Sequence, residues 1–100
     1  MTQIYHVVLV KFKPQKDFRW AALCAALNDL RCLLPGFLTC TGGPYSSPEG
    51  LNQGYSHGLV MTFVDAAARN EYLTHPDHEK VKQAFLPDLE GVVAFDFEGE

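Results

Sequence analysis

Residues 4–13 read IYHVVLVKFK, an apolar, β-branched run that stops at Pro14 and is typical of a β-strand. Side chains alternate between the two faces of a strand, so this run presents two separate rows of residues. Both rows are apolar: one contains His6, Val8, Val10 and Phe12, and the other contains Tyr5, Val7 and Leu9. A strand of this kind needs cover on both of its faces.

The residues that follow predict a helix that can cover one of these faces. Asp17 can cap the helix, and Pro35-Gly36 can end it. Between these limits the apolar residues follow the three-then-four spacing of an amphipathic helix: Trp20, Leu23, Leu27, Leu30 and Leu34. This stripe predicts packing against a sheet.

The rest of the chain predicts three more strands and a second helical layer. Residues 37–41, 55–64 and 92–97 have strand character, and residues 42–54 form a loop rich in turn-forming residues. Asp65 can cap a helical piece through Leu73, and Pro76 suits the first turn of another piece that ends near Leu86. The order βαββαβ is that of a ferredoxin-like α+β fold, a four-stranded antiparallel sheet with two helices on one face.

The face of the sheet away from the helices also carries apolar residues in its strands. Two helices shield only one face, and a large apolar face is rarely left in water. A second copy of the chain is the simplest cover. We therefore expect a homodimer, an α+β barrel in which each subunit buries roughly 800 Å² or more. A monomer with an apolar surface is the alternative.

The overall composition limits the classes of protein to which the chain can belong. Its 100 residues, 47% hydrophobic and 20% charged, suit one globular domain, residues 1–100. The formal charge of -4 argues against nucleic-acid binding, and no apolar run approaches the roughly 20 residues that cross a bilayer. Three unpaired cysteines fit no disulfide framework, and we expect them to fill the core. We expect a soluble cytoplasmic protein with no nucleic-acid or membrane partner.

Histidines and one tyrosine are the candidate functional residues. On a helix that begins at Pro76, His78 shares a face with two apolar residues, so its imidazole is expected to point inward. His6 and His57 lie in the apolar rows that we assign to the helix side, and Tyr72 lies six residues before His78. We expect all four side chains to meet in one apolar cleft. There His78 would be a general base and Tyr72 would donate a hydrogen bond to a substrate carbonyl.

Simpler interpretations of these residues remain open. A histidine on an apolar face is often a hydrogen-bonded core residue, and this holds for His6 and His57. His75 and His78 offer two nitrogen ligands one turn apart, but zinc sites need three or four ligands and the pattern places no carboxylate with them. We expect no metal and no cofactor. The strand at 55–64 lacks the basic and aromatic pattern of an RNA-binding sheet.

Several motifs together resemble the stress-responsive dimeric α+β barrel (Dabb) domain family. They are residues 6–13, Gly43-Pro44 with residues 47–58, the run Tyr72-Leu-Thr-His-Pro-Asp-His78 and the closing Phe95-Asp-Phe97, and the resemblance covers essentially the whole chain. It implies ferredoxin-like subunits paired sheet to sheet. Its relatives include stress-associated plant proteins and plant polyketide cyclases, which catalyse a cofactor-free intramolecular aldol condensation. In the cyclases the residues matching His78 and Tyr72 are catalytic, and those matching His6 and His57 line the pocket.

Two hypotheses of function follow. The first is a small dimer that binds an apolar, carbonyl-containing metabolite and acts as a cofactor-free cyclase, lyase or isomerase by abstracting a proton next to the carbonyl. The second is a noncatalytic, stress-associated structural or binding protein. An inward-facing pair of Tyr72 and His78 favours the first, because a purely structural protein does not require it.

Overall fold

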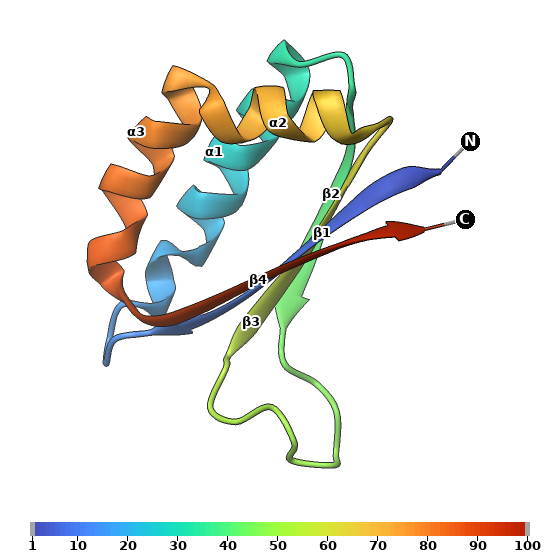
Figure 1. Ribbon diagram of the computed structural model, residues 1–100. Helices are drawn as coiled ribbons and strands as arrows, with labels where there is room; N and C mark the ends of the chain where they lie inside the picture. Colours follow the sequence, from blue (N-terminus) through green and yellow to red (C-terminus); the bar gives the residue numbers. More distant parts are fainter. Residues whose placement is uncertain (1, 100) are drawn as a thin grey trace.

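The computed structural model describes residues 2–99 and has the predicted ferredoxin-like α+β architecture (Figure 1). Four strands and three helices follow each other in the order βαββααβ, with a short 3-10 turn before the first helix and another after the last. The elements are β1 (Gln3–Phe12), η1 (Asp17–Arg19), α1 (Trp20–Leu33), β2 (Phe37–Pro44), β3 (His57–Phe63), α2 (Ala66–Thr74), α3 (Pro76–Phe85), η2 (Leu86–Asp88) and β4 (Leu89–Gly99).

The four strands form one antiparallel sheet in the order β2-β3-β1-β4, so β1 lies between β3 and β4. Alternation along β1 is as predicted: Val10 is only 2% exposed on the helix side, whereas its neighbour Leu9 is 37% exposed on the other side. Cross-strand partners share a face, and this register places Asp96 of β4 opposite His6.

Helix α1 covers the sheet with the predicted leucine stripe, of which Leu23, Leu27 and Leu30 are buried. The predicted cap at Asp17 is wrong. The chain turns after Pro14 with Gln15 at a φ of 65°, and the 3-10 turn η1 then starts at Asp17, one turn before the α-helix. Asp17 is therefore inside a helical turn, where its side chain caps nothing.

The second helical layer is broken into α2 and α3 where the sequence predicts it. The Asp65 side chain accepts a hydrogen bond of 2.9 Å from the Ala68 amide at the start of α2. At the start of α3, His75 Nδ1 accepts one of 3.0 Å from the Asp77 amide, and Pro76 occupies the first turn. The break turns the end of α2 and the start of α3 toward the same part of the sheet.

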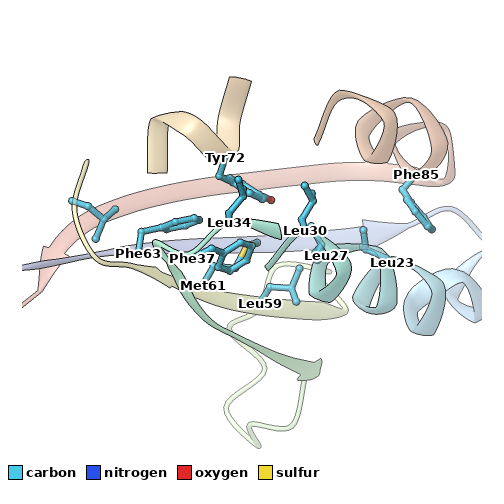
Figure 2. Packing of buried hydrophobic residues seen from close by; sticks show 11 residues of the cluster. Leu23, Leu27, Leu30, Leu34, Phe37, Leu59, Met61, Phe63, Tyr72 and Phe85 are labelled. Carbon is cyan, nitrogen blue, oxygen red and sulfur yellow. The ribbon is translucent and has the colours of Figure 1, made fainter. Parts of the chain in front are cut away.

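The core lies between the sheet and the helices. Figure 2 shows Tyr72 reaching from α2 toward the sheet and Phe85 extending from α3 beside the leucines of α1. Cys24 and Cys40 pack against this core as expected. Cys32 is exposed instead, because it lies off the buried stripe of α1. No helix within residues 2–99 is long and apolar enough to cross a membrane.

The opposite face of the sheet has no helix over it, since all three helices lie on one side (Figure 1). Tyr5 and Phe97 stack on each other across this face with ring centroids 4.9 Å apart. Large apolar side chains are exposed over the same face: Leu9, Val60, Val93, Phe95 and Phe97. We call these five residues the open face.

Candidate functional site

A cavity of about 400 Å³ lies between the sheet and the helices. Strands β1, β3 and β4 form its floor, and all three helices contribute to its walls. Its lining is almost entirely aliphatic and aromatic. Only four lining residues carry polar or charged side chains: His6, Tyr72, His78 and Lys82. An apolar hollow with a few polar groups is the usual form of a small-molecule site.

His78 reaches the cavity from the first turns of α3, as predicted. Its Nδ1 lies 3.2 Å from the Leu73 carbonyl oxygen, which can only accept a hydrogen bond, so Nδ1 carries the proton and Nε2 keeps a free lone pair. Burial lowers the pKa of His78 most. Lys82 and His6 lower it further, while the Leu73 hydrogen bond and Glu79 oppose this change. His78 is therefore neutral near pH 7 and can accept a proton.

Tyr72 lies beside His78, with the two ring centroids 4.5 Å apart, and the ring of His6 lies 5.9 Å from Tyr72. The Tyr72 side chain is only 2% exposed. Within residues 2–99, every fully enclosed side-chain polar atom has a hydrogen-bond partner. The Tyr72 hydroxyl has no partner among these residues, so it is not fully enclosed. The hydroxyl is thus open to the cavity that Tyr72 lines.

The ionisation of Tyr72 is strongly opposed by its surroundings. Burial raises the pKa of its phenol well above the usual value, and the nearby Cys40 and Asp96 raise it further. The hydroxyl accordingly keeps its proton throughout the neutral range, so it is available as a hydrogen-bond donor to a bound molecule.

His6 reaches the cavity from β1 and is held from behind by Asp96. Its Nδ1 donates a hydrogen bond to Asp96 Oδ1, and the other carboxylate oxygen accepts one of 2.7 Å from Arg69 Nη1. Burial disfavours the charge of Asp96, but the hydrogen bonds from His6 and Arg69 outweigh it and hold the pKa of this carboxyl below its usual value. The carboxylate fixes the orientation of the His6 ring through Nδ1, while Nε2 makes no contact with Asp96.

Asp96 and Arg69 are site residues that the sequence analysis missed. Asp96 continues the row of Val92 and Ala94, which face the cavity, so strand alternation alone could have identified it. The contact with Arg69 joins α2 to the edge strand β4 across the fold, and no local sequence signal predicts it.

The expectation that His57 shares this cavity is wrong. It lies on the helix side of the sheet, but its partner in β1 is Val10, four residues from His6 or about 13 Å along the strand. There its ring packs at 4.5 Å from the Trp20 ring and 5.3 Å from the Phe12 ring. Burial lowers the pKa of His57, against a smaller rise from Asp17. His57 belongs to an aromatic cluster at the far end of the sheet.

Metal-ligating side chains do not gather at this site or elsewhere in the described chain: residues 2–99 hold no cluster of three or more His, Cys, Asp or Glu side chains suited to a metal ion. Of the two histidines one turn apart, only His78 lines the cavity, while His75 Nδ1 caps α3. Lys82 contributes the one lining cation, with its ammonium 3.0 Å from Glu79 Oε2. The site thus combines the imidazoles of His6 and His78 with the phenolic donor of Tyr72.

Comparison with known proteins gives consistent matches over nearly the full chain. The profile of the Stress responsive A/B Barrel Domain family matches residues 4–99. The Arabidopsis thaliana stress-response A/B barrel domain-containing protein HS1 is 32% identical over 98 residues, a match that covers 94% of this chain and 87% of that protein.

Solved structures repeat the fold. A dimeric ferredoxin-like protein of unknown function from Jannaschia sp. CCS1 matches with a TM-score of 0.89 and 26% identity, covering 97% of this chain and 99% of the other. Hydroxynitrile lyase from Passiflora edulis matches with a TM-score of 0.87 and 20% identity over 98% of this chain and 94% of the lyase. The second likeness concerns the fold alone.

Proposed function

This chain belongs to the stress-responsive A/B barrel domain family, and from that premise we propose that it is a homodimer whose subunits each bind an apolar, carbonyl-containing metabolite. The open face supports the dimer, because large apolar side chains are exposed there and the related Jannaschia protein is dimeric. The cavity supports the ligand class, since its lining offers a carbonyl oxygen one phenolic donor and offers the rest of the molecule apolar walls.

The same cavity can carry cofactor-free acid-base chemistry. His78 Nε2 takes a proton from the carbon next to the carbonyl, and the electron pair of that C–H bond forms the C=C bond of an enolate. The carbonyl π electrons move to oxygen, where the Tyr72 hydroxyl stabilises the growing charge. Protonated His78 then returns the proton. His6 orients the ligand by accepting a hydrogen bond at Nε2.

The enolate determines which reaction classes are open. Attack on a second carbonyl of the same molecule would give a cyclase, protonation at another carbon an isomerase, and loss of a leaving group a lyase.

The juxtaposition of Tyr72 and His78, with ring centroids 4.5 Å apart in an apolar cavity, is the observation that carries this proposal. His57 is left out, because it does not line the cavity. The three free thiols are compatible with a reducing, cytoplasmic location.

Deuterium exchange into a simple probe tests the proposed chemistry without the natural substrate. Octan-2-one in D₂O exchanges the hydrogens next to its carbonyl, and NMR follows that rate. The wild-type protein should accelerate exchange, Tyr72→Phe should lose roughly 10²-fold or more of the acceleration, and His78→Gln should abolish it. His75→Asn is the matched control, since it removes an imidazole outside the cavity and keeps a good helix cap.

The noncatalytic alternative makes a different prediction in the same experiment. It is favoured by the related proteins HS1 and At5g22580, whose names describe a stress response and no reaction. A binding protein would retain an apolar ketone in the cavity without accelerating exchange. No acceleration by the wild type above a buffer containing free imidazole would therefore reject the catalytic proposal.

A further inference from the structure

We propose that Arg69 is a positioning residue for the cavity: it fixes the carboxylate of Asp96 and offsets its charge, and through that carboxylate it sets the orientation and the proton affinity of the His6 ring. This inference deepens the proposed function and rests on it for the role of the cavity. Arg69 itself does not line the cavity, so it would act only through Asp96 and His6.

The geometry gives each oxygen of Asp96 one partner. Oδ2 accepts the hydrogen bond of 2.7 Å from Arg69 Nη1, and Oδ1 accepts the one from His6 Nδ1. The side chains of Arg69 and Asp96 are 22% and 24% exposed, so water screens this pair less than it screens a surface ion pair. Arg69 lies on α2 only three residues before Tyr72. The contact thus links the helix that carries the phenol to the strand that holds the histidine.

The charges around His6 explain why a cation is needed behind Asp96. Three elements place polar or charged groups around the His6 ring. Strand β4 contributes Asp96, and α2 contributes Tyr72 as well as Arg69, which lies behind the carboxylate. Helix α3 contributes His78 and, farther along, Lys82. The neighbours of the ring on β3, Met61 and Phe63, are apolar. A lone carboxylate at Nδ1 would favour the imidazolium ion, which has no free acceptor nitrogen.

Arg69 changes this balance by cancelling most of the carboxylate charge. The pair Arg69 and Asp96 has no net charge, yet Oδ1 still orients the His6 ring. Neutral His6 can then accept a hydrogen bond or a proton from a ligand. A protonated His6 would also disfavour the proton transfer to His78, because two neighbouring cations repel each other.

Histidine titration by NMR tests this inference on the full chain without a ligand. The ring signals of His6 are followed through the neutral range in the wild type and in Arg69→Gln. Loss of the cation should raise the titration midpoint of His6 by about half to one pH unit. Arg69→Lys, which keeps the charge, should leave the midpoint near that of the wild type. Lys80→Gln is the control for net charge, because Lys80 is a solvated cation on the far side of α3 from the cavity.

Each outcome decides for or against the role of Arg69. An unchanged or lowered midpoint in Arg69→Gln would overturn it, as would an equal shift in Lys80→Gln or in Arg69→Lys. Should Arg69→Gln fail to fold, Arg69→Met preserves the apolar stem and takes its place. Because no ligand is present, a failure here leaves the exchange chemistry of Tyr72 and His78 untouched, and a failure of octan-2-one exchange leaves the His6 titration valid.

Discussion

Replacement of Phe95 by alanine is expected to weaken the proposed dimer by about four orders of magnitude. Phe95 has the largest exposed fraction among the open-face residues, 65%. A phenylalanine buries roughly 150–250 Å² when fully covered, so about 100–160 Å² of Phe95 is available to a partner. At about 25 cal/mol/Å² this area is worth roughly 3 kcal/mol per subunit and about 6 kcal/mol per symmetric dimer. Every 1.4 kcal/mol changes Kd about tenfold.

Sedimentation equilibrium of wild type and variant over a range of concentrations measures this change. Phe18→Ala is the matched control, since Phe18 is 70% exposed but lies on η1, away from the open face. The reasoning predicts a monomer for Phe95→Ala at concentrations where the wild type and Phe18→Ala remain dimers. It is refuted if Phe95→Ala keeps the wild-type Kd or if Phe18→Ala weakens association as strongly.

Three further substitutions test the site and the fold. Tyr72→Phe should change the free energy of unfolding in urea by less than about 1 kcal/mol, because the hydroxyl has no hydrogen-bond partner among residues 2–99 and the ring stays packed. Burial lowers the pKa of His78 in the folded chain, so as pH falls the unfolded chain is protonated at this histidine before the folded chain is. The free energy of unfolding should therefore fall as pH drops below about 6.5. His78→Gln should flatten this dependence in urea titrations. Gly36→Ala should lower the free energy of unfolding by about 1–3 kcal/mol in the same assay, because its new Cβ would lie 2.4 Å from the Ala68 Cβ. A wild-type value would contradict the packing of the turn before β2 against α2.

Strand alternation and helix spacing are the parts of this fold that the sequence predicts well, because both depend on neighbouring residues. The row containing His6 and Val10 faces the helices, and the stripe of α1 is buried, as their periods require. The cap at Asp65 and the helix start at Pro76 are also local and are confirmed. The predicted cap at Asp17 is wrong because the turn at Gln15 leads into a 3-10 turn that already includes Asp17.

The candidate site was predicted only in part, because a period gives the face of a strand but not the position along it. His57 shares a face with His6 and yet lies about 13 Å away, a separation that depends on the register of β1 and β3. The pairing of His6 with Asp96 depends in the same way on the register of β1 and β4, and Arg69 depends on how α2 lies over the sheet. Such long-range information is absent from local patterns.

A crystal structure of the protein soaked with octan-2-one tests the role of the cavity most directly. The account predicts that the carbonyl oxygen lies within about 3 Å of the Tyr72 hydroxyl, with the neighbouring carbon facing His78 Nε2 and the alkyl chain among the leucines of α1. A ketone bound only outside the cavity, or side chains that fill the space between Tyr72, His78 and His6, would contradict it.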